Sequence, residues 1–476
     1  MNVLQSYSDA LGLLIAALAV AFLISGLDDL IIDLCYCMRR LSRRSPTSRV
    51  LRQISLGGEE RPIAIMVPAW HEHDVIYSMV RTNRNHIDYI DYTFFIGVYQ
   101  NDPATLVEAL RAREAFPNVV VSIVPHDGPT CKADCLNVLV AAIATHERAS
   151  GRLFAGVALH DSEDVIHPLE LKLFNNLNDF YDFIQLPVYS FRRSPRHFVA
   201  GTYMDEFAEF HTKDLEVREQ LSGVVPCAGT SAFFSRLVIA GLAKPDSEVF
   251  NTSSLTEDYD VAFRLHLLGM KEVFVSFPVD FTIDTPIETA LPQCVGGRLP
   301  IATREFFPEE FRAAYRQRAR WLLGIAFQGW LNFGWKGNLG TKYFFYRDRK
   351  GVVTSILTVL AYFVVANCIV LALASTLIDR SLTPGSGGPG WTSGFLSLNL
   401  ALLSNRLVQR TYFTARIYGP VMGALAGPRM MVSNLLNFFA ALRAIYMFAD
   451  HRFSGRPIVW DKTQHVLPAN PLEFAE

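Results

Sequence analysis

Two long apolar segments bracket most of this chain and restrict the folds that it can adopt. The first runs from Ala10 to Leu27 and continues through DDLIIDL to Leu34, and the second runs from Gly351 to Ile378. About 20 apolar residues in a helix suffice to cross the hydrocarbon core of a bilayer. The sequence therefore predicts a membrane protein, and a mean hydropathy of +0.20 agrees with that prediction.

The surroundings of the first segment favour a retained anchor over a cleaved signal peptide. No basic region precedes the segment, and no small-residue cleavage site follows it. A cluster of arginines follows, namely Arg39, Arg40, Arg43, Arg44 and Arg49. Because arginine-rich flanks stay on the cytoplasmic side, residues 1–37 are predicted to be an N-terminal transmembrane anchor that ends in the cytoplasm.

Residues 60–335 have the pattern of a cytoplasmic α/β domain. Short apolar runs typical of buried strands alternate with segments of helical periodicity. The runs are PIAIMVPAW (62–70), TFFIGVYQ (93–100), VVVSIVPH (119–126), LFAGVALHD (153–161) and FIQLPVYS (183–190). This alternation predicts a mostly parallel sheet with helices on both faces, and in such sheets ligands bind beyond the carboxyl ends of the strands.

Residues 350–450 are predicted to form a transmembrane hairpin followed by interfacial helices. The second apolar segment leads into a loop rich in Gly, Pro and Ser at 381–390. Residues 391–403 are apolar enough to begin a third span, although they are few. Residues 405–418, NRLVQRTYFTARIY, predict an amphipathic helix whose arginines face lipid headgroups.

The last apolar segment, 430–449, contains Arg443. A charged residue inside a span is costly, so this segment is predicted to be a second interfacial helix in preference to a fourth span. Residues 451–476 are more polar and are predicted to form a cytoplasmic C-terminal tail.

Composition excludes some classes of function. The formal net charge is −2, so no basic excess points to nucleic acid as a partner. The seven cysteines show no CxxC pair or repeated His/Cys spacing, which argues against a zinc site and against a disulfide framework. We therefore expect free thiols in a reducing compartment.

Three acidic residues stand close together where the fourth apolar run ends. They are Asp161, Glu163 and Asp164, and they follow His160. Carboxylates this close repel one another, and a hard divalent cation bound to their oxygens removes the repulsion. An acidic turn that caps the next helix is the alternative, because Asp and Ser are favoured at helix N-termini.

The second candidate is a Thr-Glu-Asp sequence, Thr256 to Asp258, which opens the helical segment EDYDVAFRLHLLG. One interpretation is a plain helix start, with Thr256 as the cap and acidic residues in the first turn. The other is a general base, because a hydroxyl is a weak nucleophile and a carboxylate can take its proton as it attacks. Asp258, with Glu257 beside it, is the candidate base.

The third candidate is the helical sequence Gln317-Arg318-Ala319-Arg320-Trp321. Arginine and glutamine donors suit a diphosphate, and an indole offers a flat apolar face. The alternative is a juxtamembrane helix whose arginines meet lipid phosphates.

The order and spacing of these three sequences resemble the inverting family 2 glycosyltransferases, particularly the membrane-bound, polymer-forming branch that includes cellulose and hyaluronan synthases. The resemblance implies a GT-A fold, which is α/β with a Rossmann-like mixed, mostly parallel sheet, joined here to α-helical transmembrane segments. It implies a UDP-sugar donor, Mg²⁺ or Mn²⁺ as cofactor, and Asp258 as general base with Glu257 nearby. Gln317, Arg318, Arg320 and Trp321 would serve the diphosphate and the acceptor.

Further positions match segments of that family. VPAWHE (67–72) resembles the nucleotide-binding first strand and implicates Pro68 and Glu72. Lys132 and Asn137 in KADCLN would lie near the nucleotide, as would Asn101 or Asp102 after the second strand. Gly229 and Thr230 in CAGTSAF would line the acceptor site.

The metal motif departs from the family's usual Asp-x-Asp and leaves a choice of ligands. Asp161 is the ligand expected on the donor side, with Glu163 or Asp164 as its partner. Alternation along a strand places residues 161 and 163 on one side, which favours Glu163.

Several other segments resemble the adsorption protein B-like membrane glycosyltransferases of bacteria. They are HDSEDVIHPLEL, REFFPEEF, RQRARWLLGIAFQGW, YRDRKG, SNLLNFFAALRA and WDKTQH. This resemblance implies an inner-membrane enzyme of exopolysaccharide or cell-surface glycan synthesis, with membrane lipid around it and an outer-membrane export partner. Such proteins continue after WDKT into a cyclic-di-GMP-binding domain, which is expected to be absent from this sequence.

Two alternative functions remain open at this point. One is the transfer of a single sugar to a lipid carrier instead of to a growing glycan, although the Gln-x-x-Arg-Trp sequence favours polymerisation. The other is a non-catalytic membrane receptor or scaffold of an export complex. The presence of Asp161, Asp258 and Arg320 argues against the second.

Overall fold

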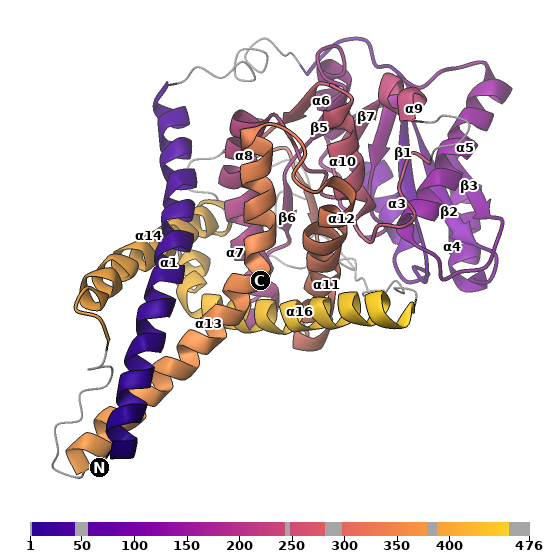
Figure 1. Ribbon diagram of the computed structural model, residues 1–476. Helices are drawn as coiled ribbons and strands as arrows, with labels where there is room; N and C mark the ends of the chain where they lie inside the picture. Colours follow the sequence, from indigo (N-terminus) through magenta and orange to yellow (C-terminus); the bar gives the residue numbers. More distant parts are fainter. Residues whose placement is uncertain (1, 43–55, 243–247, 281–297, 378–387, 457–476) are drawn as a thin grey trace.

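The computed structural model describes residues 2–42, 56–242, 248–280, 298–377 and 388–456. An α/β domain forms one end of the molecule, and helices α1 (Asn2–Ser42) and α13 (Leu339–Leu377) project from it as a pair (Figure 1). Arg43, Arg44, Arg49, most of the predicted loop 381–390 and nearly all of the tail 451–476 lie outside the described residues.

A seven-stranded sheet with the order β3-β2-β1-β4-β7-β5-β8 forms the centre of the α/β domain. Its strands are β1 (Ile63–Pro68), β2 (Tyr92–Tyr99), β3 (Val119–Val124), β4 (Gly156–Leu159), β5 (Phe183–Gln185), β7 (Ala232–Ser235) and β8 (Glu272–Phe274). β7 runs antiparallel to both of its neighbours, and the other pairs are parallel. Each of the five predicted runs contains a strand of this sheet.

The apolar runs form strands because both faces of the sheet are covered. All six residues of β1 are buried. Its alternate residues enter two separate apolar clusters, with Ile63, Ile65 and Val67 in one and Ala64 and Met66 in the other. The helices that cover the sheet are α3 (Ile76–His86), α4 (Pro103–Ala115), α5 (Lys132–Ser150), α6 (Glu170–Leu177), α9 (Arg236–Leu242) and α10 (Glu257–Leu267).

A second layer of helices lies between the sheet and the projecting pair (Figure 1). Two continuous helical segments in this layer each contain a π-helical stretch, labelled η. They are α7 (Phe198–Glu209), η1 (Phe210–Asp214) and α8 (Leu215–Ser222), and α11 (Phe311–Leu322), η2 (Leu323–Gln328) and α12 (Gly329–Phe333). Short strand pairs complete the domain: β6 (Val188–Ser190) with β11 (Thr303–Glu305), and β9 (Pro278–Asp280) with β10 (Arg298–Pro300).

Both predicted apolar segments lie within single long helices. Leu11 and Leu18 of α1 are buried against Val364 and Leu371 of α13. Within the described residues, three helices are long and apolar enough to cross a membrane, namely Ser6–Leu41, Leu339–Thr376 and Ala426–Ser454.

The region 391–418 forms one helix, α14 (Thr392–Tyr418), where the sequence predicted a short span followed by an interfacial helix. It begins beside α1, where Asn399 donates to the Ala19 carbonyl at 2.8 Å, and its last turn is buried in the α/β domain. The prediction for its arginines was wrong, because Arg406 pairs with Asp29 and Arg410 pairs with Glu209. The pattern of an amphipathic helix is the same whether the acidic partner is lipid or protein.

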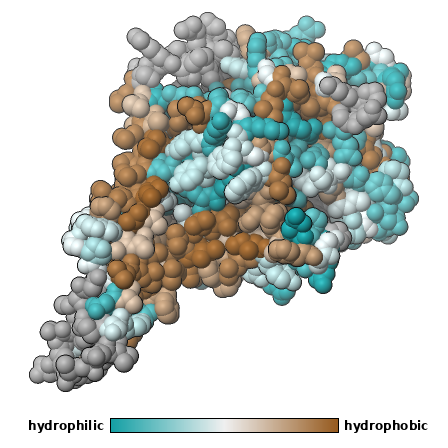
Figure 2. Space-filling view, in the orientation of Figure 1, coloured by the Kyte–Doolittle hydropathy of each residue, from teal (hydrophilic) through white to brown (hydrophobic). Residues whose placement is uncertain are grey.

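The last helix, α16 (Ala426–Ser454), crosses the foot of the α/β domain and does not run alongside α1 (Figure 1). Its inner face packs on α7, α11 and α13. Its outer face exposes an apolar stripe made of Met431, Leu435, Phe439, Leu442, Ile445 and Tyr446. Figure 2 shows apolar surface running along this region toward the projecting helices.

Candidate functional site

A cavity of about 520 Å³ opens beyond the carboxyl ends of β1 and β4. The ends of these strands, the start of α5, the start of α10 and one face of α11 form its walls. Eleven residues selected from the sequence line it: Pro68, Glu72, Lys132, Asp161, Glu163, Gly229, Glu257, Asp258, Gln317, Arg320 and Trp321.

Lys132 lies at the centre of the polar part of this cavity. Its Nζ is 2.5 Å from Asp161 Oδ1 and donates to the Gly229 carbonyl at 3.0 Å. Burial by itself lowers the pKa of a lysine, but the carboxylates of Asp161, Glu257 and Asp258 hold the pKa of Lys132 above its ordinary value. One ammonium group therefore compensates several carboxylates.

Gly229 allows the chain to pass close to both groups. Its φ is +80°, in the left-handed region that glycine adopts without strain. A Cβ atom at this position would lie 2.8 Å from Asp258 Oδ2 and 3.5 Å from Lys132 Nζ. Any larger residue would therefore push against the candidate base.

The start of α10 places Glu257 and Asp258 at the cavity. Thr256 occupies the N-cap position, but its side chain makes no capping hydrogen bond. Asp258 Oδ1 accepts from the Tyr259 backbone N–H at 2.7 Å. Burial raises the pKa of Asp258, with Lys132 opposing the rise, and burial together with the Asp258 carboxylate raises the pKa of Glu257.

The acidic cluster after β4 divides between the cavity and the core. Asp161 and Glu163 line the cavity. The Asp164 side chain is fully buried, where it accepts from the Asp161 N–H at 2.8 Å and from the Thr230 hydroxyl. It also pairs with His160 at 3.1 Å. Asp164 and Thr230 thus hold the loop together instead of facing the cavity, in contrast to their predicted roles.

His160 links this loop to the next helix. Its Nε2 lies 3.1 Å from Glu170 Oε1, and both side chains are fully buried. Burial lowers the pKa of a histidine, but Glu170 and Asp164 together raise the pKa of His160 to about 9. A charged imidazolium between two carboxylates therefore fixes the loop that presents Asp161.

Helix α11 presents three of its four selected residues to the cavity. Gln317, Arg320 and Trp321 are spaced i, i+3 and i+4 and so share one face. Arg318 points the other way, pairing with Glu206 at 2.7 Å and donating to Thr202 Oγ1 at 2.8 Å. The predicted role of Arg318 at the diphosphate or acceptor is therefore wrong, because helical phase turns it toward α7.

Comparisons with known proteins decide the family. Residues 156–377 match the model described as glycosyl transferase family group 2. Bacteriophage adsorption protein B of Escherichia coli (strain K12) is 41% identical over 481 residues, which cover 98% of this chain and 64% of that protein. Bacteriophage N4 adsorption protein B of Escherichia coli O157:H7 matches with the same identity and coverage.

Residues 156–377 of this chain therefore contain a domain of glycosyl transferase family group 2. The chain spans about 64% of the length of the adsorption proteins that it matches. A solved structure of mannosyltransferase PcManGT from Pyrobaculum calidifontis, in complex with GDP-Man and Mn2+, has a TM-score of 0.51 and 13% sequence identity. That comparison covers 91% of this chain and 99% of the mannosyltransferase chain. The likeness concerns the fold, and the predicted GT-A class with added membrane helices is confirmed.

Three further residues selected from the family pattern do not line the cavity, namely Asn101, Asn137 and Asp102. Asn101 exchanges hydrogen bonds with the backbone of Gly128, at 2.7 and 2.9 Å. Asn137 does the same with the backbone of Phe250, at 2.8 and 2.9 Å. Both amides connect loops and neither lines the cavity, so the structure places them away from the predicted nucleotide site.

Asp102 likewise does not line the cavity. Its side chain caps α4 and accepts from the His71 backbone N–H at 2.6 Å. His71 has a φ of +55°, which is uncommon for a residue with a side chain. Asp102 therefore stabilises a turn that carries Trp70 and Glu72, both of which line the cavity.

Trp70 and Glu305 are among the lining residues that were missed in the sequence. Glu305 ends β11, whose parallel pairing with β6 joins Thr303 to Val188. Burial and the nearby carboxylates after β4 raise the pKa of Glu305 well above its usual range. Trp70 follows β1 directly, and its aromatic type was a usable signal, whereas nothing local to Glu305 reveals the strand pairing.

The residues present fit a divalent cation shared with a diphosphate. Among the described residues, no group of three or more His, Cys, Asp or Glu side chains is arranged to hold a metal alone. Mg²⁺ is commonly bound through one or two carboxylates plus substrate phosphates, and carboxylates also suit Mn²⁺. Asp161 and Glu163 supply that number of hard oxygen ligands at the cavity wall.

The lining of the cavity also includes residues of α7, η1, α8, α13 and α14. They are Glu206, Phe207, Glu209, Phe210, Asp214, Arg218, Asp348 and Arg410. We call this part of the cavity the arm. Carboxylates, guanidinium groups and aromatic rings all line the arm. The sequence pattern did not predict this part of the cavity.

Proposed function

We propose that this chain is an inverting membrane glycosyltransferase that moves a sugar from a UDP-sugar to a hydroxyl of a growing exopolysaccharide or cell-surface glycan. The observation that supports it is the convergence of Lys132, Asp161, Asp258 and Arg320 on one cavity from four separate elements. These groups supply the three requirements of the reaction, which are a diphosphate site, a base and an acceptor site.

The donor diphosphate would lie at the Asp161 end of the cavity. Mg²⁺ or Mn²⁺ held by Asp161 and Glu163 supplies charge neutralisation for the diphosphate when it is bound. Lys132, which already contacts Asp161 at 2.5 Å, adds a second positive charge on the same side. Gln317 and Arg320 donate hydrogen bonds from α11, and Arg-phosphate contacts are among the stronger ones in proteins.

Asp258 would take the proton of the acceptor hydroxyl. The hydroxyl oxygen attacks the anomeric carbon, a new C–O bond forms there, and the bond to the diphosphate oxygen breaks with its electron pair leaving on the diphosphate. A single displacement of this kind inverts the anomeric centre. The raised pKa of Asp258 brings the base nearer to neutral pH, where proton transfer is most effective.

The donor is tested by a thermal-shift panel on the purified protein. UDP-sugars and GDP-mannose are compared with Mg²⁺, with Mn²⁺ and with a chelator. A ligand at 100 times its Kd stabilises the folded state by about 2.7 kcal/mol. We expect UDP-sugars to raise the melting temperature only with metal. If only GDP-mannose raises the melting temperature, the donor is not a UDP-sugar. If no nucleotide sugar raises it, the result supports the scaffold alternative.

We also propose a topology for the bacterial inner membrane. α1 and α13 span it, the first half of α14 returns the chain across it beside α1, α16 lies in its cytoplasmic interface, and the α/β domain is cytoplasmic. Arg39 at the cytoplasmic end of α1 pairs with Glu216 of the α/β domain, so that end of α1 and the domain share one side. The exposed apolar stripe of α16 suits a helix half-embedded in a membrane surface.

Reporter fusions test this topology. A reporter inserted between Gly388 and Pro389 is expected to report the periplasm, and one placed after Gly455 the cytoplasm. A fusion in the exposed turn at Gly151 serves as the cytoplasmic reference. If the fusion after Gly455 reports the periplasm, α16 is a span and the in-plane assignment is wrong.

A further inference from the structure

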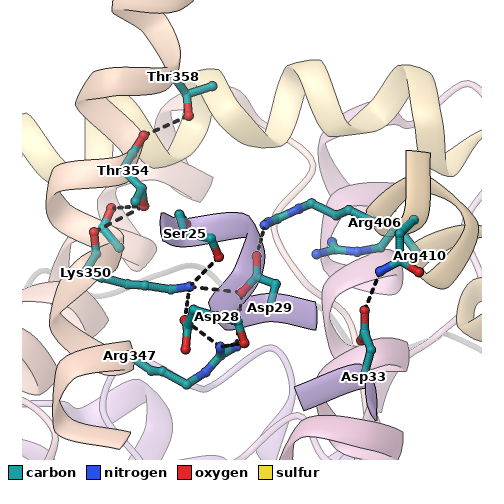
Figure 3. A network of polar contacts seen from close by, with 12 residues as sticks. Ser25, Asp28, Asp29, Asp33, Arg347, Lys350, Thr354, Thr358, Arg406 and Arg410 are labelled. Carbon is teal, nitrogen blue, oxygen red and sulfur yellow. Dashed lines mark hydrogen bonds and ion pairs between the residues drawn. The ribbon is translucent and has the colours of Figure 1, made fainter. Parts of the chain in front are cut away.

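Helix α1 carries four carboxylates, and three of them, Asp28, Asp29 and Asp33, lie in its second half. Asp28 and Asp33 are each only 5% exposed. Ionisable residues within membrane helices are costly and are usually retained for a function. Figure 3 shows the Asp28 and Asp29 side chains directed at basic residues of neighbouring helices.

The first set of contacts joins α1 to α13 and α14. Arg347 NH1 lies 2.7 Å from Asp28 Oδ2, and Lys350 Nζ lies 3.0 Å from Asp29 Oδ1. Lys350 also pairs with Asp28, and Arg406 lies 2.6 Å from Asp29 Oδ2 (Figure 3). These pairs fix the packing of the anchor and explain why the carboxylates are tolerated.

The second set leads from α1 into the cavity wall. Asp33 Oδ1 lies 2.5 Å from Lys213 Nζ, and Lys213 lies 2.7 Å from Glu209 Oε1. The other oxygen of Glu209 lies 2.5 Å from Arg410 Nε. Glu209 and Arg410 line the arm of the cavity, whereas Asp33 and Lys213 lie behind it.

Lys213 is almost fully buried and depends on its carboxylates. It is 4% exposed, and a third carboxylate, Asp214, lies 3.9 Å from its Nζ. Asp214 also lines the arm. Without Asp33, the buried ammonium group of Lys213 would keep its ion pair with Glu209 but lose the other of its two close ion pairs. It would therefore move toward the third carboxylate, Asp214. A change on α1 would thereby alter the charge of the arm.

We infer that α1 is a positioning element of the catalytic unit as well as an anchor. Asp33 holds Lys213, Lys213 holds Glu209, and Glu209 holds Arg410 on the arm. The donor occupies the Asp161 end of the cavity under the proposed function, so the arm is the path of the acceptor. The inference that the arm receives the acceptor rests on the proposed function, whereas the link from Asp33 to the arm does not.

A chemical probe of the arm tests this link without any enzymatic assay. Phe210→Cys places a thiol on the arm, where the native ring is 40% exposed, with Cys37 and Cys131 replaced by serine. Anionic and cationic methanethiosulfonates report the local charge by their relative rates. Asp33→Asn is expected to raise the anionic-to-cationic rate ratio by about threefold or more, because local potentials set such rates.

Two further variants serve as controls for the rate ratio. Asp33→Glu keeps the charge and is expected to leave the ratio unchanged. Asp450→Asn removes a carboxylate that accepts from Ser454 of its own helix, away from the arm, and should also leave the ratio unchanged. An Asp33→Asn ratio equal to wild type, in protein with an unchanged melting temperature, would overturn the inference.

Activity then tests the role of the arm. Native membranes are supplied with labelled donor, and UDP release to water is compared with label entering membrane-associated product. Asp33→Asn is expected to reduce label incorporation at least about tenfold, since small displacements of positioning groups have such effects, and to change UDP release by less than about twofold. A parallel loss of both would assign Asp33 a structural role only. Absence of UDP release in wild type would refute the proposed function and leave the thiol result standing.

Discussion

Asp258→Asn is expected to bind the nucleotide sugar as wild type does and to lose about 10² to 10⁴ of the transfer rate. The reason is positional, because Asp258 belongs to the start of α10, whereas the proposed donor ligands Asp161 and Glu163 follow β4. Donor binding is measured by thermal shift, and transfer by UDP release with acceptor present.

A purely structural role for Asp258 predicts a different result. Asparagine caps helices nearly as well as aspartate, and its side-chain oxygen can still accept from the Tyr259 N–H. The loss would then be about 0.3–1 kcal/mol of stability through the helix dipole, with activity retained. A variant that keeps most of its transfer rate would remove Asp258 from the mechanism.

Asp260→Asn provides a matched control on the same helix. Asp260 also lies in the first turn of α10, but it pairs with Arg264 and accepts from Asn332, outside the cavity lining. Its replacement removes a similar charge from the helix start. Stability is expected to fall more than in Asp258→Asn, while the transfer rate per folded molecule is retained.

The pH dependence gives an independent check on the base. Burial raises the pKa of Asp258, and Asp161 adds to the rise, while Lys132 opposes it. Transfer requires the ionised form, so the rate should increase with pH through a midpoint above the ordinary range of an aspartate. The sign for stability is opposite: a carboxyl whose pKa is raised on folding loses stability as pH rises through that pKa.

Much of the fold was predictable because its signals are local. Apolar runs and helical spacing marked the strands, the flanking helices and the two projecting helices. The position of Asp161 followed from its place at the end of a strand. Lys132 could be selected only through the resemblance to a family, since a lysine at a helix start is otherwise ordinary. For Asp258, the residues left a base and a plain helix start open, and the resemblance favoured the base.

The errors arise where a side chain's direction depends on distant residues. Arg318 was grouped with Arg320, although a helix turns by about 100° per residue and so places residues two apart on nearly opposite sides. That error was avoidable from the spacing alone. Glu305 and the arm were not predictable, because they depend on the pairing of β11 with β6 and on the packing of α7 against α14.

Asp161→Asn is expected to abolish the metal-dependent part of donor binding and to leave the fold intact. Asp161 is only partly buried and faces the cavity, so its loss leaves no fully buried charge without a partner. Lys132 would keep the Gly229 carbonyl and the Glu257 and Asp258 carboxylates nearby. Thermal shifts with donor are compared with Mn²⁺ and with a chelator.

The contact between Lys132 and Asp161 affects the result expected for Asp161→Asn. In the structure the ammonium group of Lys132 lies 2.5 Å from Oδ1 of Asp161, the residue that would hold the cation. A positive charge therefore remains next to Asp161 when the metal is removed. Wild type should gain about 2.7 kcal/mol at 100 times its Kd with metal, and Asp161→Asn should show only the smaller shift seen with chelator.

Asp164→Asn separates a ligand from a structural carboxylate in the same loop. Asp164 is buried and contacts His160 and Thr230, so its replacement should lower the melting temperature. The thermal shift caused by the donor should keep the same ratio between metal and chelator. If Asp161→Asn keeps its metal-dependent shift while Asp164→Asn loses it, the metal ligands have been assigned to the wrong side of the loop. Equal shifts with metal and chelator in wild type would exclude a metal from donor binding altogether.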